Sequence, residues 1–322
     1  MKNRKIIGVG YQVGNKCVKN KEFEKIIDTT DEWILSRTGI KTRYVSTNKN
    51  TSELGFLAAK KAILNANISK EEIDLIIVAT ITPDNTTPSC SCLIQDKLGL
   101  NKKKIMAFDI NAACTGFVYA LQVASYMLSD YKCALVIGVD VNSKIVDYTD
   151  RNTCILFGDG AGAIIMKQED TNNEMIHYAN SIGDHEGFLS ASGLVIHEKL
   201  ENASREIGFI KQNGSEVFRF AVGALEEAIS EVLKKANKTL DEIDYVIPHQ
   251  ANIRIIDNVA KKINLNKNKL YINLDKYGNT TAGSIPIALS EAITKDIVKE
   301  GMKIILVGFG GGFTYAASYI EL

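Results

Sequence analysis

The chain has 322 residues, of which 45% are hydrophobic and 24% charged, a balance typical of a globular protein with one or two domains and a sizeable core. Lysine plus arginine and aspartate plus glutamate both number 38, so no overall electric field draws the chain to nucleic acid or to a membrane surface. Apolar runs such as residues 76–81 are far shorter than the roughly 18 residues that a membrane-spanning helix needs.

The N-terminal segment differs from a signal peptide, because Lys2, Arg4 and Lys5 are followed by only a short apolar run. The six cysteines are scattered over a long chain, which favours reduced thiols over a disulfide framework. Cys90 and Cys92 have no further metal ligands nearby in the sequence. We therefore expect a cytoplasmic protein without a metal site.

A short helix is expected between Thr30, a favoured N-cap residue, and Gly39, a residue type that often ends helices. Trp33 and Arg37 are four residues apart and share one face of this helix. Together they could present an aromatic plane and a cation to an adenine nucleotide. A half-buried tryptophan with an arginine lying along it is the commoner explanation of such a pair.

The two halves of the chain resemble each other. Residues 65–80 align with residues 235–250 at a constant offset of 170, with identities that include Asn67/Asn237 and Asp74/Asp244. In both halves the order is an amphipathic helix (53–66 and 218–236), an acidic turn and a short apolar strand. We infer a duplication, with halves of about 1–170 and 171–322.

Helices that alternate with short apolar strands predict an α/β fold in which helices cover the sheets. Beyond the repeated strands just described, we expect strands at residues 105–110, 134–139, 162–166, 304–307 and 315–320. Residues 183–213 are rich in Gly, Ser, Asn and charges without a clear period, which predicts a long loop of possible functional use.

Cys114 follows the expected strand at 105–110 and precedes an apolar helix that begins near Thr115. At such a junction, unpaired backbone N–H groups and the helix dipole favour a thiolate, so Cys114 is a candidate nucleophile. A small buried residue in a strand-to-helix turn is the alternative, and for an isolated cysteine it is the commoner one.

His249 follows a strand that Pro248 ends, so its imidazole is expected at the C-terminal edge of a sheet, where α/β folds build their sites. A structural histidine is the commoner alternative.

Asn279 lies in the repeat's counterpart of the cysteine loop, and the duplication predicts that both loops face one pocket. An asparagine in a glycine-flanked turn is the simpler explanation. The remaining histidines are expected in surface or loop positions: His177, His185 and His197.

The glycine-rich run at 308–314 joins two apolar strands instead of opening a helix, so a nucleotide-phosphate loop is not expected there. Its backbone N–H groups could instead approach a reacting carbonyl as an oxyanion hole.

Together, these segments resemble β-ketoacyl-acyl carrier protein synthase III, a condensing enzyme of the thiolase superfamily that initiates bacterial type II fatty acid synthesis. The resemblance runs over nearly the whole chain, and several separate motifs occur in the right order. They are residues 30–40, 111–117, 157–162, 216–218, 249–252 and 278–286, followed by the terminal glycine-rich strand pair. The family's Cys, His and Asn fall on Cys114, His249 and Asn279.

The resemblance implies a fold of duplicated thiolase-like halves, layered α/β/α/β/α with two mixed sheets, in a homodimer. The first half would carry the nucleophile, and the second His249 and Asn279. An acyl group from acyl-coenzyme A would load onto Cys114. Malonyl-acyl carrier protein would then lose carbon dioxide and condense with that group to give 3-oxoacyl-acyl carrier protein. The backbone N–H groups of Cys114 and Gly311 would hold the oxyanion. No cofactor is implied, because the coenzyme A thioester is a substrate.

Further residues receive roles from the same resemblance. Trp33 and Arg151 would sandwich the adenine of coenzyme A, with Arg37 near its phosphates, and Phe218 and Asn252 would also contact it. A basic patch would dock the acidic carrier protein: Arg219, Arg254, Lys261 and Lys262.

Two departures from the family pattern leave the primer chain length and branching open. The loop at 189–193 lacks the pattern of Pro and Gly common there, and Thr87 stands where many members have Phe. In the family this position reaches across the dimer interface into the partner's acyl pocket, so Thr87 would leave space for longer or branched primers.

Three other readings stay open. A secondary-metabolism or hydroxymethylglutaryl-type synthase would share the three residues, but the latter usually needs an acidic base, and no Glu lies near Cys114 in sequence. A non-catalytic thiolase-fold subunit would typically lose the nucleophile, which is present here. An aldehyde dehydrogenase would need a Gly-x-Gly-x-x-Gly motif after a strand, which is absent.

Overall fold

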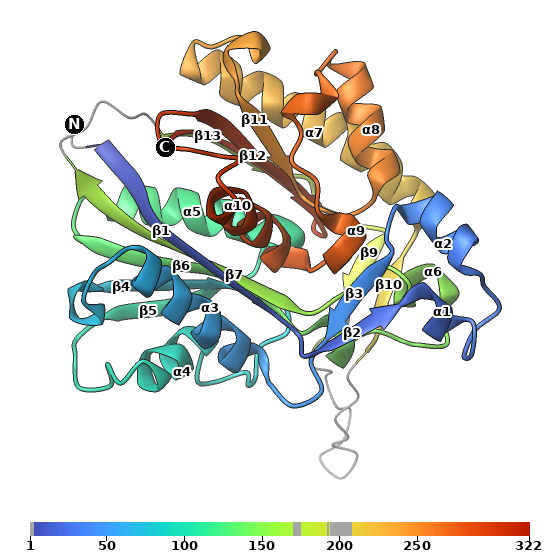
Figure 1. Cartoon of the computed structure of the whole chain (residues 1–322), viewed down its shortest axis with the longest axis horizontal. Helices are drawn as coiled ribbons and strands as arrows, with labels where there is room; N and C mark the ends of the chain where they lie inside the picture. The colour runs from blue at the N-terminus through green and yellow to red at the C-terminus, as the bar shows by residue number, and fades with distance from the viewer. Residues whose placement is uncertain (1–2, 170–174, 192, 194–207) are drawn as a thin grey trace.

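The computed structural model describes residues 3–169, 175–191, 193 and 208–322. Two mixed β-sheets form its frame (Figure 1). In the first sheet, β7 pairs antiparallel with both of its neighbours and the remaining contacts are parallel. Its order is β1 (Asn3–Val13), β7 (Gly160–Glu169), β6 (Cys133–Asp140), β4 (Leu75–Ala79) and β5 (Met106–Ile110).

The second sheet repeats four strands of the first in order and direction. It runs β8 (Met175–Ser181), β13 (Thr314–Glu321), β12 (Lys303–Gly310) and β11 (Tyr245–Pro248), with only the last pair parallel. The register is repeated as well. Ile76 pairs with Leu135 in the first sheet, and Val246 with Ile305 in the second, at the offset of 170 seen in the sequence.

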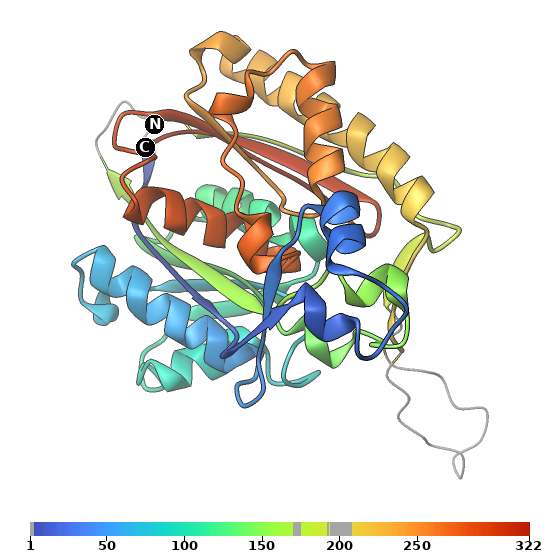
Figure 2. The ribbon, with the colours of Figure 1, turned by 45° about the vertical axis from the view of Figure 1, so that its right-hand side comes forward.

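Helices cover both outer faces and fill the space between the sheets (Figures 1 and 2). Helices α3 (Thr51–Asn65) and α4 (Cys90–Lys97) pack on the first sheet, and α7 (Gly214–Ala236) and α8 (Ile253–Lys262) on the second. Helices α5 (Gly116–Met127) and α10 (Ser284–Thr294) form a central layer that shares one apolar core with both sheets. The expected α/β/α/β/α layering is therefore confirmed.

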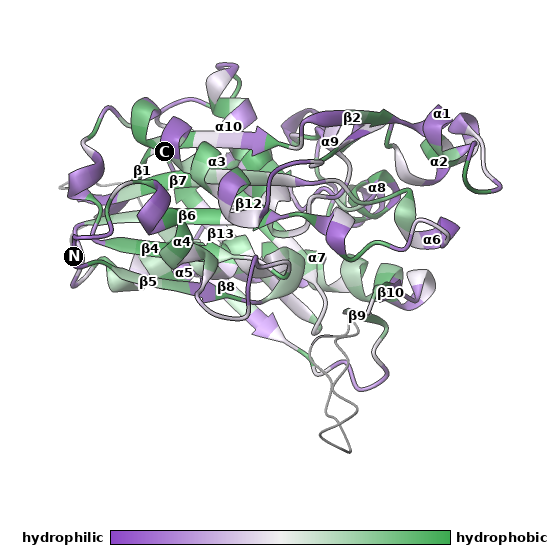
Figure 3. Cartoon of the chain, turned by 90° about the horizontal axis from the view of Figure 1, so that it is seen from below, coloured by the Kyte–Doolittle hydropathy of each residue, from purple (hydrophilic) through white to green (hydrophobic). Residues whose placement is uncertain are grey.

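The central helices are apolar on most sides, as helices buried between two sheets must be. In α10, every residue from Ser284 to Ala292 is buried. Figure 3 shows hydrophobic residues concentrated along the strands, whereas the outer helices carry both hydrophobic and hydrophilic residues. Among the described residues, no helix is both long and apolar enough to cross a bilayer.

A group of short helices and strands packs beside one end of the two sheets (Figure 2). It shares an apolar cluster that includes Ile34, Ile40 and Phe157. Thr30 caps its main helix, because the Oγ1 atom accepts a hydrogen bond from Trp33 N at 3.1 Å, and Gly39 ends it at φ 80°. The elements are β2 (Lys16–Lys19), α1 (Asn20–Phe23), α2 (Asp31–Thr38), β3 (Thr42–Val45), α6 (Arg151–Cys154), β9 (Leu189–Ala191), β10 (Ile210–Gln212) and α9 (Leu274–Tyr277).

Two expectations from the sequence need correction. The segment at 183–213 is not only loop, because β9 and β10 pair within its described part. His177 is not a surface or loop residue but lies buried in β8, where its Nδ1 is 2.8 Å from Ser318 Oγ. Polar and apolar residues alternate only weakly along β8, so the sequence did not predict this strand or the burial of His177. His185 is exposed as expected, and His197 lies outside the described residues.

Candidate active site

Cys114 sits in a tight turn between strand and helix. After β5 the chain makes the 3-10 turn η2 (Ala113–Thr115), with Ala113 at φ 47°, and continues directly into α5. The Cys114 side chain is buried at 7% exposure. Burial raises the pKa of its thiol to about 12, and the charge of Asp140 adds to the rise. The expectation that this turn favours a thiolate is therefore wrong for the resting site, where desolvation prevails.

His249 lies directly after β11 and continues the parallel ladder, because its N–H donates to Val307 O at 2.8 Å. The ring is 1% exposed, and its Nδ1 lies 2.6 Å from Ser284 Oγ. Phe309 packs edge-on against the imidazole, with ring centroids 5.4 Å apart. Burial lowers the pKa of His249 to about 3, so the imidazole is neutral near pH 7.

Asn279 follows Gly278, which takes φ 65° and ends α9. Its backbone is fixed on both sides, because its N–H donates to Leu156 O and its carbonyl accepts from Gly158 N, both at 2.9 Å. The side-chain Oδ1 accepts from Thr281 N at 2.9 Å. This contact orients the amide, and among the described residues Nδ2 has no acceptor, so it can donate to a ligand.

Strand β12 lies beside both Cys114 and His249. A side-chain carbon placed on Gly308 would lie 3.8 Å from both Cys114 O and the Cβ atom of His249. A side-chain carbon on Gly310 would lie 2.7 Å from Cys114 N, which no real side chain could tolerate. Glycine at these positions therefore leaves the space beside the cysteine N–H open.

One cavity of about 2220 Å³ connects the predicted site residues. Its walls include Cys114, His249, Asn279 and Gly311. They also include all but one of the residues expected to bind coenzyme A, namely Trp33, Arg37, Phe218 and Asn252, as well as Thr87 and Arg254. Thr87 is exposed and lines the cavity of its own chain. Among the described residues, no group of three or more His, Cys, Asp or Glu side chains is placed to hold a metal ion.

The arrangement around Trp33 differs from the expected sandwich. Arg151 does not line the cavity wall but lies on the Trp33 ring itself, with its guanidinium carbon 4.8 Å from the ring centroid, and Arg37 is at 5.9 Å. An adenine between Trp33 and Arg151 needs a gap of roughly 7 Å, two van der Waals contacts of about 3.5 Å. The stacked pair must separate before an adenine can enter.

The four cations expected to dock a carrier protein are not equivalent. Arg219 pairs with Glu216 at 3.0 Å, and Lys262 pairs with Glu226. Arg254 and Lys261 have no carboxylate within ion-pair distance among the described residues. Only Arg254 of the four lines the cavity.

Sequence reasoning missed two buried residues that support the site, Ser284 and Asp140. Ser284 contacts His249, and it stands inside the motif at 278–286, five residues after Asn279. Asp140 ends β6, where a carboxylate after an apolar strand was a visible signal. Its Oδ2 accepts from Ala282 N at 3.1 Å and from the Thr281 hydroxyl.

Comparisons with known proteins agree along the whole chain. Two family models described as 3-oxoacyl-[acyl-carrier-protein] synthase III match, one over residues 108–182 and its C-terminal counterpart over residues 233–322. The β-ketoacyl-[acyl-carrier-protein] synthase III of Clostridium acetobutylicum is 47% identical over 324 residues, which cover 100% of this chain and 99% of that protein.

Solved structures show the same relationship. The crystal structure of 3-oxoacyl-[acyl-carrier-protein] synthase III from Aquifex aeolicus superposes with a TM-score of 0.92 at 43% identity, covering 99% of this chain and 100% of that one. The priming β-ketosynthase of the R1128 polyketide pathway reaches a TM-score of 0.90 at 30% identity, covering 99% and 96%.

Proposed function

Because the chain belongs to the β-ketoacyl-[acyl-carrier-protein] synthase III family, whose condensation initiates fatty acid synthesis, we propose that Cys114, His249 and Asn279 catalyse this reaction. The substrates are an acyl-coenzyme A primer and malonyl-acyl carrier protein. The observation that carries the proposal is the shared cavity, which Cys114, His249 and Asn279 all line. The reaction takes place in the cytoplasm and uses no resident cofactor or metal.

In the first step the Cys114 sulfur attacks the thioester carbonyl of the primer. A Cys114 S–C bond forms, the C–S bond to coenzyme A breaks, and the cysteine proton ends on the coenzyme A sulfur. One thioester replaces another, so the step is close to energetically neutral. The buried thiol is protonated at rest, and this proton must leave as the new bond forms.

In the second step malonyl-carrier protein loses carbon dioxide. The electron pair of the broken C–C bond passes to the thioester oxygen, giving an enolate. His249 Nε2–H and Asn279 Nδ2–H donate to that oxygen, and their burial strengthens both interactions. A neutral histidine suits this role, because it keeps a donor without adding a charge that must be desolvated.

In the third step the enolate carbon attacks the acyl-Cys114 carbonyl, and the backbone N–H groups of Cys114 and Gly311 stabilise the oxyanion. Collapse of this intermediate breaks the Cys114 S–C bond and releases 3-oxoacyl-carrier protein, and the expelled thiolate takes up a proton from solvent. The duplicated half supports this assignment. Ala282 occupies the middle of η7 (Thr281–Gly283), as Cys114 does in η2, and Asp140 ends β6 as Gly310 ends β12. There, Ala282 N–H binds a carboxylate oxygen of Asp140. The same turn at Cys114 lies open to a substrate oxyanion, because Gly310 has no side chain.

Coenzyme A enters along the wall formed by α2 and the start of α7. Arg37 and Phe218 both line this cavity. Arg37 lies near the phosphates, and Phe218 also contacts the coenzyme. The Asn252 side chain already caps α8 and donates to Arg37 O at 3.1 Å, so it acts partly by holding α2 in place. Arg151 moves off Trp33 to admit the adenine.

The active form is a homodimer, and its halves divide near residue 170. Strand β5 is an edge strand with a free ladder of backbone groups, and Met106 on it is 45% exposed. Pairing of β5 with a second copy would cover this edge. The loop of Thr87 lies between β4 and α4, beside this edge strand, where a partner's acyl pocket can receive it.

The two half-reactions test the proposal separately. Cys114→Ala should remove acyl transfer, read as loss of the acyl adduct by mass spectrometry, and retain decarboxylation of malonyl-carrier protein. His249→Ala and Asn279→Ala should do the reverse, with decarboxylation reduced roughly 100- to 1000-fold. Cys133→Ala, another buried cysteine, is the matched control. An adduct on another cysteine, or normal decarboxylation by His249→Ala, contradicts the assignment.

A further inference from the structure

The hydroxyl of Ser284 lies behind the imidazole of His249, on the side away from the cavity. Ser284 is the first residue of α10 and is 2% exposed. Its Oγ atom is 2.6 Å from His249 Nδ1 and 3.2 Å from the backbone nitrogen of Gln250. Both neighbours are themselves buried, so every proton in this cluster needs a partner.

The Gln250 backbone nitrogen can only donate, and it donates to Ser284 Oγ. The serine hydroxyl has one proton, and among the described residues His249 Nδ1 is its only other contact within hydrogen-bond distance. If the proton of the neutral imidazole stood on Nδ1, Ser284 Oγ would accept twice and its own proton would remain unpaired in a buried site. If the hydroxyl donates to Nδ1, all three groups are satisfied.

We propose that Ser284 is a positioning residue that holds neutral His249 in the tautomer with its proton on Nε2. This inference rests on the proposed function, because that tautomer is the one that presents an N–H donor to the enolate oxygen. In the other tautomer Nε2 would carry a lone pair, which repels a developing oxyanion.

The turn η7 therefore orients both hydrogen-bond donors of the site. Asn279 and Ser284 flank η7 and lie five residues apart, and each fixes the orientation of one donor. Thr281 N directs the Asn279 amide, and Ser284 directs the His249 imidazole. Thr281 is held at φ 48°, an unusual conformation for a β-branched residue, with its hydroxyl bound to Asp140.

The test compares Ser284→Ala with Ser290→Ala. Ser290 is a buried serine of the same helix, and its hydroxyl donates to Gly10 O at 3.2 Å, away from the histidine. We expect Ser284→Ala to slow decarboxylation of malonyl-carrier protein roughly tenfold, the effect of one hydrogen bond, and to spare acylation of Cys114. Ser290→Ala should leave both half-reactions unchanged, and Ser284→Thr should keep the wild-type rates.

Nitrogen NMR of protein labelled at its four histidines reads the tautomer directly. In the wild type, the His249 signals, identified by their loss in His249→Asn, should show an unprotonated Nδ1 and a protonated Nε2. Ser284→Ala should mix or reverse these states. A protonated Nδ1 in the wild type, or an unchanged tautomer and rate in Ser284→Ala, overturns the inference. The wild-type spectrum decides even if Ser284→Ala does not fold. Failure of the proposed function would appear differently, as normal decarboxylation by His249→Ala.

Discussion

At the scale of single residues, burial controls the chemistry of the site more than sequence position does. The sequence places Cys114 at a helix start, from which a thiolate is expected, but desolvation raises the pKa of this thiol instead. The same burial keeps His249 neutral. Candidate residues could be chosen from the chain because their types and neighbours are local. Their protonation depends on burial by distant elements such as β12, and no local pattern predicts which elements pack against the site.

The raised pKa of Cys114 predicts how its alkylation depends on pH. An acid whose pKa is raised stays protonated at neutral pH, and below the pKa the thiolate fraction grows about tenfold per pH unit. Iodoacetamide labelling of Cys114 should therefore keep rising between about pH 7 and about pH 10. Peptide mass spectrometry distinguishes this site from the exposed Cys17 and Cys92. A plateau below about pH 8 would mean that the helix terminus lowers the pKa after all.

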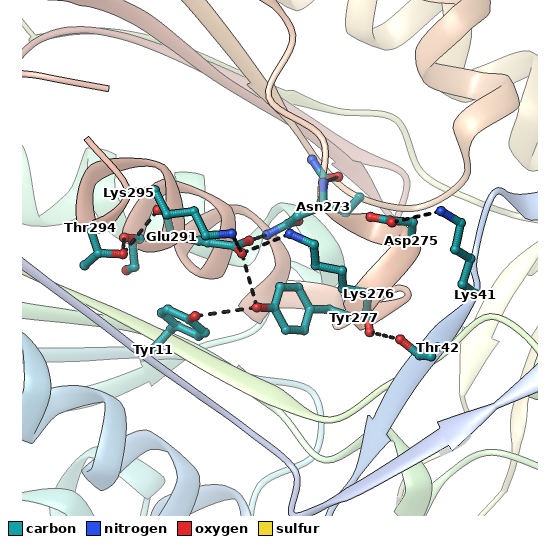
Figure 4. A network of polar contacts seen from close by, with 12 residues as sticks. Tyr11, Lys41, Thr42, Asn273, Asp275, Lys276, Tyr277, Glu291, Thr294 and Lys295 are labelled. Carbon is teal, nitrogen blue, oxygen red and sulfur yellow. Dashed lines mark hydrogen bonds and ion pairs between the residues drawn. The ribbon is translucent and has the colours of Figure 1, made fainter. Parts of the chain in front are cut away.

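At the scale of elements, Asn279 depends on how α9 is anchored. Figure 4 shows α9 held to α10 through the buried carboxylate of Glu291. Glu291 accepts from Asn273 Nδ2 at 2.7 Å and Lys276 Nζ at 3.2 Å, and it also pairs with Lys295. On the other side, Thr42 Oγ1 donates to Lys276 O at 2.7 Å. Asn279 lies two residues after the end of this anchored helix.

Glu291→Gln should therefore affect one half-reaction more than the other. Loss of the charge weakens several hydrogen bonds and should lower the free energy of unfolding by roughly 2 kcal/mol at neutral pH. Decarboxylation should fall more than acylation, because Asn279 moves and Cys114 does not. Both are measured well below the unfolding temperature. Glu300→Gln, which alters an exposed ion pair with Lys5, is the control. Equal losses in both half-reactions would contradict this role for α9.

The same substitution has a pH signature. Burial acts to raise the pKa of Glu291, but hydrogen bonds from Lys295 and Asn273 outweigh it and hold the pKa below its ordinary value. A carboxylate with a lowered pKa stabilises the fold above the unfolded-state pKa of about 4.3, and this contribution is lost as the pH falls through the folded-state value. Denaturant titrations should therefore show the wild type and Glu291→Gln converging in acid.

Element types and their order could largely be predicted from the sequence, because apolar period and repeated segments are local signals. The expected helix at 53–66 is observed as α3, and the expected strand at 134–139 lies within β6. The support of the site could not be predicted. Ser284 and Asp140 act through contacts across 35 and 142 residues of chain, with His249 and Ala282 respectively. Only the folded sheets bring these pairs together.

At the scale of the whole molecule, a net charge of zero means that any attraction to an acidic partner must be local. Three of the six cations of α7 and α8 pair with carboxylates, namely Arg219, Lys234 and Lys262, and Lys235 instead lies over the Tyr178 ring and donates to His177 O. Arg254 and Lys261 remain without a carboxylate partner among the described residues. Arg254 also lines the cavity that the proposed carrier-bound substrate would have to enter.

Arg254→Glu should therefore weaken the carrier-protein step and spare the coenzyme A step. We expect kcat/KM for malonyl-carrier protein to fall roughly tenfold at low salt, because a complementary charge becomes a repulsive one. Added salt should slow the wild type toward the variant, since exposed charges are screened over about 10 Å at 0.1 M.

Arg219→Glu is the matched control, and its effect should be smaller because Arg219 already pairs with Glu216 and is 76% exposed. Acylation of Cys114 by acetyl-coenzyme A, followed by mass spectrometry, should stay within about twofold of wild type for both variants. If the rates do not depend on salt, Arg254 does not dock the carrier protein. If both half-reactions lose activity equally, Arg254 instead binds the coenzyme A phosphates.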